Sequence, residues 1–179
     1  VIQIIKNNSN LKTSEINIAY CPERVLPGNI LFELINNDRV IGGYTEKSSR
    51  IAKDLYKTFC KGKLLVTDSK TAELVKLTEN AFRDVNLAFA NELSMICDEY
   101  KINTKELISI ANFHPRVNIL NPGCGVGGHC IAVDPWFLIS DLPKKAKLLR
   151  MARDVNNEKA FWVLDCIRKK VSELEKKLK

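Results

Sequence analysis

The sequence predicts an α/β segment followed by a mostly α-helical region with long helices, and two observations support this. Three short runs rich in Ile and Val (16–21, 39–43 and 63–68) are bounded by Pro, Gly, Asn or Asp, as strands usually are. From Ser69 onward, 32 residues pass without Gly or Pro, and apolar side chains recur at helical spacing. Three strands are too few for a complete doubly wound domain, so we expect the closing part of one.

Each helix has its own local signals. Between the second and third strands, residues 46–62 follow a helical pattern that ends at a glycine, a residue typical of helix ends. The run 69–100 predicts one helix, long enough to span the molecule or to pair with a second copy. Residues 103–113 predict a shorter helix capped at Asn103 or Thr104.

The last part of the chain combines a glycine-rich loop with two helical stretches. Pro135 is expected to interrupt the first stretch, and a basic helix then covers residues 144–179. This basic helix carries 12 basic and 5 acidic residues, whereas the other 143 residues carry 16 of each sign. Since the whole net charge of +7 lies on one helical segment without aromatic interleaving, we expect a solvated helix face and no nucleic-acid partner.

Composition disfavours further classes of protein. No uninterrupted apolar run approaches the ~20 residues that a membrane-spanning helix requires, so we expect no membrane partner. The six cysteines form no C-x-x-C pair, and Cys124, His129 and Cys130 lack the ligand spacing and the fourth partner of a zinc site. We therefore expect free thiols, a reducing cytoplasmic setting and no metal.

The glycine-rich loop contains a literal G-x-G-x-x-G at Gly123, Gly125 and Gly128, within NPGCGVGGHCIAVDPWFL (121–138). A dinucleotide-binding fingerprint requires a strand before the glycines, a helix that opens at the third glycine, and an acid about 20 residues later. Here Pro122 abuts the first glycine, the preceding strand pattern is weak, and no acid stands at that spacing. The glycines therefore match the fingerprint in spacing alone.

Cys130 is the chemically distinctive residue of this loop. It follows Gly127 and Gly128 and is expected at the first turn of a helix, where the macrodipole favours the thiolate. Asp134, four residues on, would share that helix face. A thiol beside a carboxylate, on a loop that lets substrate approach closely, is a candidate nucleophile; a buried structural cysteine is the alternative.

Four segments of the chain resemble the nucleotide-sugar 6-dehydrogenases, a family that oxidises UDP-glucose, GDP-mannose and related sugars to uronic acids. The glycine loop, PGCGVGGHCIAVDPWFL, is similar to the branch acting on UDP-N-acetylmannosamine or UDP-N-acetylglucosamine. The other segments are YCPERVLPGNILFELINNDRVIGG, TDSKTAELVKLTENAFRDVNLAFANEL and ARDVN (152–156). They follow the family's order and together cover nearly the whole chain.

The resemblance implies a domain organisation. Family members have an N-terminal NAD-binding Rossmann domain, a central helical dimerisation domain and a C-terminal UDP-binding domain. This chain would contain the C-terminal part of the NAD-binding α/β domain (1–68), the central helical domain (69–143), and a long basic helix (144–179) leading to a UDP-binding domain that it lacks. NAD is then the expected cofactor and a UDP-sugar the expected substrate. We expect a homodimer through the long central helix, and a fragment that is inactive alone.

The resemblance also implies five catalytic residues. Cys130 matches the nucleophile that traps the aldehyde between two oxidations. Lys76 and Asn80 match residues that stabilise developing oxygen charge, and Asp134 matches a carboxylate that orients water or relays a proton. Glu23 matches the base in thioester hydrolysis. Without the resemblance, Lys76 and Asn80 would be a solvated helix pair and Glu23 a surface turn carboxylate.

Four further residues match substrate-binding positions: Gly125, Gly127, Gly128 and Arg116. The chain departs from the family at three places. Many UDP-glucose enzymes have glutamate where this chain has Pro27 and lysine where it has Val133, which favours the N-acetylmannosamine branch. Cys124 replaces a proline usual in that branch, which predicts a looser loop. A UDP-glucose or GDP-mannose 6-dehydrogenase, and a non-catalytic dimerisation fragment of a truncated gene, remain alternatives.

Overall fold

The computed structural model describes residues 1–177, apart from the side chain of Thr13. The chain divides into two units, Val1–Lys76 and Leu77–Lys179, and each is described by itself. Helix α4 (Ser69–Tyr100) begins in the first unit and continues into the second. Within residues 1–177, no helix combines the length and the apolar character needed to cross a bilayer.

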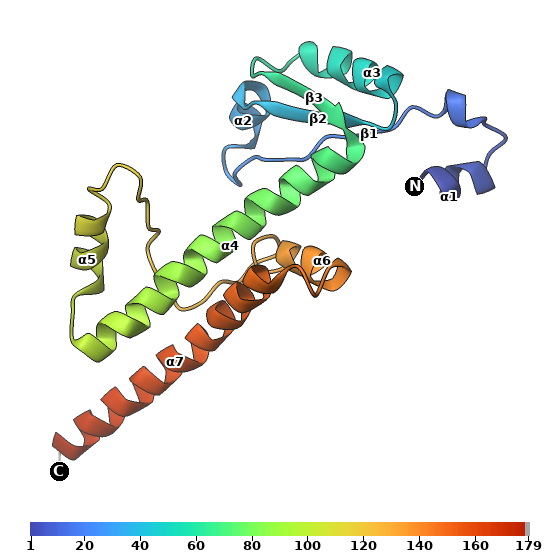
Figure 1. Ribbon diagram of the computed structural model, residues 1–179. Helices are drawn as coiled ribbons and strands as arrows, with labels where there is room; N and C mark the ends of the chain where they lie inside the picture. The colour runs from blue at the N-terminus through green and yellow to red at the C-terminus, as the bar shows by residue number, and fades with distance from the viewer. Residues whose placement is uncertain (178–179) are drawn as a thin grey trace. The chain divides into compact units, whose positions relative to one another are not determined.

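The first unit is built on a three-stranded sheet with the order β1–β2–β3 (Figure 1). β1 (Ala19–Tyr20) pairs antiparallel with β2 (Arg39–Gly43), and β2 pairs in parallel with β3 (Leu64–Asp68). All five residues of the central strand β2 are buried. The three predicted strands are therefore present, although the first is shortened to two residues.

Helix α3 (Glu46–Lys57) connects β2 to β3 and packs on both strands (Figure 1). Its N-cap residue is Thr45, whose Oγ1 accepts a hydrogen bond from the Ser48 backbone N–H at 3.1 Å. The helix predicted over 46–62 is thus present but ends five residues earlier than expected. Three short segments that we did not predict complete the unit: α1 (Ile2–Asn7), the 3₁₀ turn η1 (Thr13–Glu15) and α2 (Ile30–Asn36).

Gly42 marks where the sheet meets the start of α4. A Cβ built on this residue would lie 2.4 Å from the Ala72 Cβ and 2.6 Å from the Asp68 carbonyl oxygen. Such contacts are far inside van der Waals distance, so only glycine fits here without moving the backbone.

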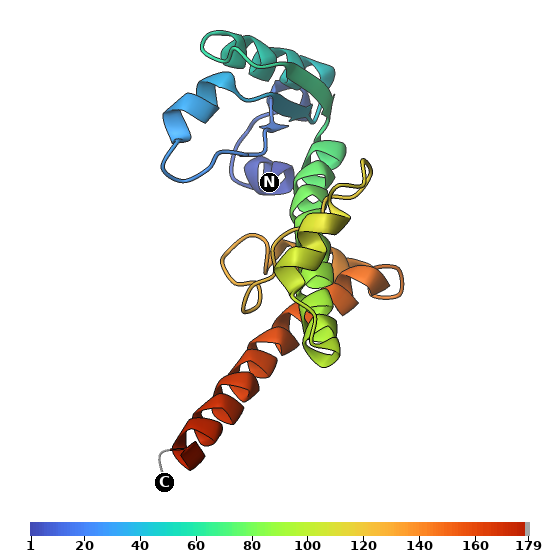
Figure 2. The same ribbon diagram turned by 90° about the vertical axis from the view of Figure 1, so that its left-hand side faces the viewer.

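The second unit consists of the continuation of α4 together with α5 (Thr104–Ala111), α6 (Asp134–Asp141) and α7 (Lys147–Lys177). α4 has the predicted bounds, 69–100. Asn103 caps α5 as expected, because its Oδ1 accepts backbone hydrogen bonds from Lys105 and Glu106. The basic helix predicted over 144–179 is present as α7, which begins three residues later than predicted, and residues 178–179 lie outside the described part. Figure 2 shows its C-terminal half extending away from the other helices of this unit.

The interior of this second unit combines small apolar side chains with many polar ones. Ala81, Ala88 and Ala90 of α4 are buried, as is Ala152 of α7. The buried polar and charged residues between the same helices are Asn80, Asp84, Asn91, Arg153, Asn156 and Lys159. Because buried polar groups are costly unless they are hydrogen-bonded, this interior depends on specific pairing as well as on apolar packing.

Candidate active site

The glycine loop joins α5 to α6, and its backbone adopts conformations that favour glycine. Gly125 and Gly128 have φ values of +128° and +93°, a region that side-chain-bearing residues rarely occupy. The Gly123 N–H donates to Asn91 Oδ1 on α4 at 2.8 Å. The glycines therefore shape an irregular loop anchored to a helix. They do not form the strand–turn–helix motif of a dinucleotide site, and the sequence had predicted this difference.

Cys130 is exposed near the end of this loop. It precedes α6 by four residues, so our prediction that it occupies the first turn of a helix is wrong. The Cys130 carbonyl oxygen accepts hydrogen bonds from the N–H groups of Val133 and Asp134, at 3.1 and 2.8 Å, which form the turn that leads into the helix. The reason for the later start is Pro135, since proline suits the first positions of a helix, where no backbone donor is required.

Pro135 also corrects a second expectation. We predicted that it would interrupt a helix, but it is the second residue of α6 and is buried. The segment before Pro135 is a turn and the segment after it is helical. This arrangement places Asp134 at the first position of α6, where acidic residues are common in helices.

Asn80 and Asp134 are brought together although 54 residues separate them in the sequence. Asn80 Nδ2 donates to Asp134 Oδ2 at 2.5 Å, and the Asn80 side chain is buried in α4. The amide therefore fixes the orientation of a carboxylate that lies one short turn from the Cys130 thiol along the chain. A carboxylate held in one orientation can position a water molecule or accept a proton during acyl chemistry.

Two other predicted residues occupy simpler environments. Lys76 is half-buried, one helical turn before Asn80 in α4. Arg116 is exposed in the turn that follows α5, where its backbone N–H donates to His114 Nδ1 at 3.3 Å. Gly127 and Gly128 are exposed, and Gly125 is half-buried.

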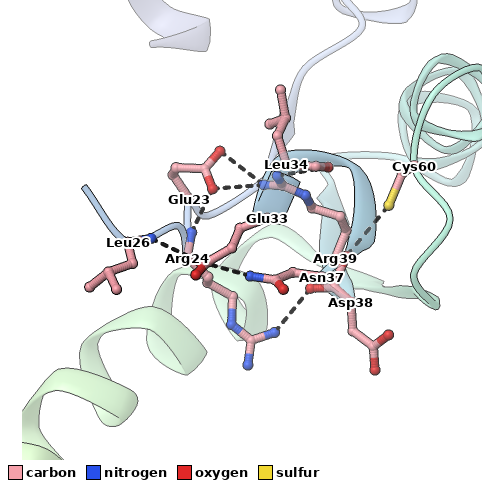
Figure 3. A network of polar contacts seen from close by, with 9 residues as sticks. All are labelled: Glu23, Arg24, Leu26, Glu33, Leu34, Asn37, Asp38, Arg39 and Cys60. Atoms are coloured by element: carbon pink, nitrogen blue, oxygen red, sulfur yellow. Dashed lines mark hydrogen bonds and ion pairs between the residues drawn. The ribbon is translucent and has the colours of Figure 1, made fainter. Parts of the chain in front are cut away.

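Glu23 belongs to a polar network in the first unit (Figure 3). Arg39 Nη1 donates to both Glu23 carboxylate oxygens at 2.9 Å, and the Arg24 N–H donates to Oε1 at 2.7 Å. The second guanidinium nitrogen of Arg39 donates to the Leu34 carbonyl at 3.2 Å. Glu23 is therefore the ion-pair partner of a buried arginine and not an isolated carboxylate in a surface turn. We did not predict Arg39, although a charged residue opening the buried strand RVIGG is a visible signal.

The pKa of Glu23 lies below its ordinary value. Partial burial acts to raise this pKa, but the hydrogen bond and charge of Arg39 and the backbone hydrogen bonds outweigh it. The ion pair therefore keeps Glu23 ionised, which is the form that a general base needs. It also lowers the proton affinity of the carboxylate, so Glu23 is a weaker base than a free glutamate.

A buried network behind the glycine loop was also missed from the sequence. It joins Asp84 and Asn91 of α4 to Arg153 and Asn156 of α7 through hydrogen bonds of 2.7–2.8 Å. These polar residues recur at helical spacings, seven apart on α4 and three apart on α7, on faces that otherwise carry buried alanine. That recurrence is the sequence signal that could have revealed them.

The first unit also contains a hollow of about 560 Å³ where the parallel strands β2 and β3 end. It is lined by residues of β2, α3 and β3, including Thr45, Arg50 and Asp68. None of the predicted site residues lines it. The residues predicted for catalysis and substrate binding therefore lie outside this hollow.

Two sequence models of one family match the chain. The UDP-glucose/GDP-mannose dehydrogenase family, NAD binding domain, matches residues 1–60, and the central domain of the same family matches residues 70–158. Among curated relatives, the NDP-N-acetyl-D-galactosaminuronic acid dehydrogenase of Ralstonia nicotianae is 63% identical over 155 residues, covering 87% of this chain and 37% of the relative. The UDP-N-acetyl-D-mannosamine dehydrogenase of Escherichia coli K12 is 61% identical over 160 residues, covering 89% and 38%.

A solved structure extends the match to three dimensions. The UDP-D-ManNAc dehydrogenase from Pyrococcus horikoshii is similar with a TM-score of 0.92 and 40% sequence identity, covering 97% of this chain and 42% of that chain. The predicted fold class, the end of a Rossmann-type domain followed by a mostly helical domain with long helices, is confirmed. The chain spans about two fifths of the length of the relatives that it matches.

Proposed function

Because the chain belongs to the UDP-glucose/GDP-mannose dehydrogenase family, we propose that it forms the catalytic core of an NAD-dependent nucleotide-sugar 6-dehydrogenase. The reaction is the four-electron oxidation of the C6 alcohol of a UDP-N-acetylhexosamine, preferably UDP-N-acetylmannosamine, to the uronic acid. Relatives named for N-acetylated sugars support this substrate class. The observation that carries the proposal is the exposed Cys130 four residues before Asp134, whose carboxylate is held by Asn80.

We assign residues 1–68 to the end of an NAD-binding domain, 69–143 to a central catalytic and dimerisation domain, and 144–179 to a helix leading to a UDP-binding domain. NAD is the electron acceptor for both oxidations. Residues 1–177 contribute closing strands to that domain and no glycine loop of strand–turn–helix type. No contact with NAD is therefore assigned to them.

Cys130 performs the covalent chemistry. After the first two-electron oxidation, its thiolate adds to the C6 aldehyde, and the new C–S bond gives a thiohemiacetal. The second two-electron oxidation removes the remaining C6 hydrogen of the aldehyde carbon and gives a thioester. Water then adds to the thioester carbonyl, the C–S bond breaks, and the acid leaves while the thiolate is regenerated. The covalent bond keeps the reactive aldehyde on the protein between the two oxidations.

The other site residues stabilise charge and move protons. Lys76 and Asn80 stabilise the negative charge that develops on the C6 oxygen, since fixed donors are most effective where charge forms. Asp134, oriented by Asn80, positions the hydrolytic water or relays its proton. Glu23 assists as base in thioester hydrolysis, with the limited strength that its ion pair with Arg39 allows.

The glycine loop and one arginine contact the substrate. The backbone of Gly125, Gly127 and Gly128 lines the sugar pocket, since residues without side chains let a sugar approach the main chain. The exposed Arg116 reaches toward the sugar or its phosphates, because a guanidinium matches phosphate oxygens in charge and geometry.

We further propose a homodimer through α4 and a cytoplasmic setting. Phe82, Phe89 and Ile96 repeat every seven residues along α4 and are 68%, 56% and 44% exposed. An apolar stripe at this spacing is typical of a helix that pairs with another helix. All six cysteines are free, which fits a reducing compartment.

The test uses the complete protein that contains this chain and follows NADH formation. The substrate panel is UDP-N-acetylmannosamine, UDP-N-acetylgalactosamine, UDP-N-acetylglucosamine, UDP-glucose and GDP-mannose. We expect two NADH per sugar with an N-acetylated substrate, and loss of this turnover in Cys130→Ala. Preference for UDP-glucose or GDP-mannose would assign the protein to another branch of the family. A fully active Cys130→Ala variant would refute the assignment of Cys130 as the nucleophile.

A non-catalytic dimerisation module is the second candidate, favoured by the apolar stripe on α4. We expect the isolated 179-residue chain to be a dimer without dehydrogenase activity. Light scattering after size exclusion would measure its mass, with Phe89→Glu expected to give monomers and Phe161→Glu on α7 as the matched control. Turnover by the isolated chain would contradict this expectation.

A further inference from the structure

A chain of buried hydrogen bonds leads from an ion pair to the backbone of the glycine loop. Arg153 Nη1 donates to Asp84 Oδ1 at 2.7 Å, and Asn156 Nδ2 donates to the same oxygen at 2.8 Å. Asn91 Nδ2 donates to Asn156 Oδ1 at 2.8 Å, and the Gly123 N–H donates to Asn91 Oδ1 at 2.8 Å. The four side chains are 0–3% exposed, so the hydrogen bonds among them are shielded from water.

The donor-to-acceptor direction of this series of hydrogen bonds is fixed at both ends. The Gly123 N–H can only donate, so it requires an oxygen from Asn91, and the Asn91 amide nitrogen must then face Asn156. At the other end, Asn156 Nδ2 faces two acceptors, Asp84 Oδ1 and the Asp84 carbonyl oxygen, the latter at 3.1 Å. Neither amide can rotate by 180° without placing like groups against each other. The network therefore holds one arrangement.

Two further contacts join α7 to the loop. The Asn156 carbonyl oxygen lies 3.0 Å from where a Cβ would stand on Gly125, so the loop backbone packs directly on α7. Arg153 Nη2 also faces the Val126 carbonyl oxygen, at 3.5 Å. The loop is thus held at 123, 125 and 126, and Cys130 follows four residues later.

We propose that Asn91 is a positioning residue for Cys130: backed by Asn156 and the Asp84–Arg153 ion pair, it holds the glycine loop at Gly123 and so sets where the thiol meets the sugar. This inference rests on the proposed function for its catalytic part. Asn91 makes no contact with the Cys130 thiol and acts through the loop backbone. Small displacements of a reacting group cost large factors in rate, so the effect should fall on the chemical step.

The principal test compares Asn91→Leu with Ser94→Ala in the complete protein. Leucine has the same number of side-chain heavy atoms as asparagine, with the same branching, but it neither accepts from Gly123 nor donates to Asn156. Ser94 is the matched control, because its Oγ accepts from Lys159 Nζ at 2.7 Å and so also joins α4 to α7, without contacting the loop. We expect Asn91→Leu to lower kcat about 10- to 100-fold with KM within about threefold. Ser94→Ala should keep kcat within about twofold while lowering the unfolding midpoint in urea.

A second readout separates positioning from general loss of structure. A displaced thiol traps the aldehyde less well, so Asn91→Leu should release aldehyde, captured with semicarbazide, and yield fewer than two NADH per sugar. If Asn91→Leu fails to fold, Gly123→Pro removes the same donor from the loop side, and Gly123→Ala retains it with a Cβ no closer than 3.7 Å to its neighbours. The proline variant should reproduce the loss of kcat and the alanine variant should not.

Amide hydrogen exchange of peptide 121–133 tests the inference independently of any substrate. We expect faster exchange at Gly123 in Asn91→Leu and unchanged exchange in Ser94→Ala. If the wild type oxidises no sugar, the proposed function fails, while faster exchange in Asn91→Leu alone would still support the anchoring of the loop. Unchanged exchange, or equal losses of kcat in Asn91→Leu and Ser94→Ala, would overturn the inference.

Discussion

Two arginine–carboxylate pairs, one in each unit, differ mainly in the exposure of the carboxylate. Arg39 and Arg153 are both buried, and each has a buried Nε without a hydrogen-bond partner among the described residues. Glu23, the partner of Arg39, has a side chain that is 51% exposed, whereas Asp84, the partner of Arg153, is 1% exposed. Nitrogen–oxygen distances are similar, 2.9 and 2.7 Å, so the contact itself does not distinguish the pairs.

The difference in exposure reverses the shift in pKa. Burial raises the pKa of Asp84 and outweighs the hydrogen bond and charge of Arg153 and the hydrogen bond of Asn156. Burial also acts on Glu23, but there the hydrogen bonds and charge prevail and the pKa is lowered. The nitrogen–oxygen distance of an ion pair therefore does not by itself show how much the pair stabilises the fold, because desolvation decides whether the carboxylate pKa is raised or lowered.

The largest expected effect tests the buried pair by truncation. Asp84→Ala leaves the Arg153 guanidinium buried without its counter-charge, so we expect the free energy of unfolding to fall by about 3–5 kcal/mol. Glu23→Ala should cost about 1 kcal/mol or less, because water can reach the position that the exposed carboxylate leaves. Urea denaturation followed by circular dichroism would measure both, and equal losses would contradict the role given to burial.

A smaller effect tests whether the buried pair's network also constrains the loop. Gly125→Ala places a Cβ 3.0 Å from the Asn156 carbonyl oxygen on a backbone with φ of +128°, so we expect a loss of about 1–3 kcal/mol. Gly127→Ala is the matched control, because its Cβ would meet nothing within 4 Å. Thermal unfolding of the two variants side by side is the measurement. A loss of stability in Gly127→Ala as large as in Gly125→Ala would show that packing of the loop on α7 at Gly125 does not contribute to stability.

The smallest effect is the pH dependence of each pair. The pKa of Glu23 in the folded protein is below its ordinary value of 4.5, so the stability from this pair is complete above 4.5 and is lost as pH falls through the folded value. The pKa of Asp84 is raised above 3.8, so its contribution is most favourable below 3.8 and declines as pH rises through the folded value.

Subtracting the unfolding free energies of two isosteric variants isolates these slopes. As pH falls from about 6 to about 3, the unfolding free energy of the wild type minus that of Glu23→Gln should decrease. The corresponding difference for Asp84→Asn should increase. Denaturant titrations at each pH provide the values. Two slopes of the same sign would remove the distinction drawn between the pairs.

Local signals predicted the regular elements well. The run 69–100 without Gly or Pro predicted both ends of α4, and the cap of α5 was predicted as Asn103 or Thr104, of which Asn103 is the cap. Helix ends are predictable because they depend on nearby residues. α2 was missed because seven residues offer too few turns for periodicity to be visible. The start of α6 was misplaced because Pro135 was taken as a helix breaker, although its position at the helix start is favourable.

Contacts between distant segments were beyond such signals. The partners of Asp84 lie 69 and 72 residues away in the sequence, and Arg39 is 16 residues from Glu23. Asn80 was predicted through the family resemblance and Asp134 also from its spacing to Cys130, but their hydrogen bond was not predicted, since it depends on how α4 and α6 pack. The candidate residues were thus available from the sequence, whereas the pairs that orient them required the fold.

The exposed end of α7 has a consequence for chain length. Every described side chain from 167 to 177 is exposed, so these turns can change in length without disturbing the interior of the unit. The position of any segment joined beyond these turns would still change with their length, because each inserted residue shifts that segment by about 1.5 Å along the helix axis and rotates it by about 100°. Seven inserted residues would advance it by about 10 Å yet restore its facing to within about 20°. Among homologous chains, insertions and deletions in this stretch should therefore come in steps of about seven.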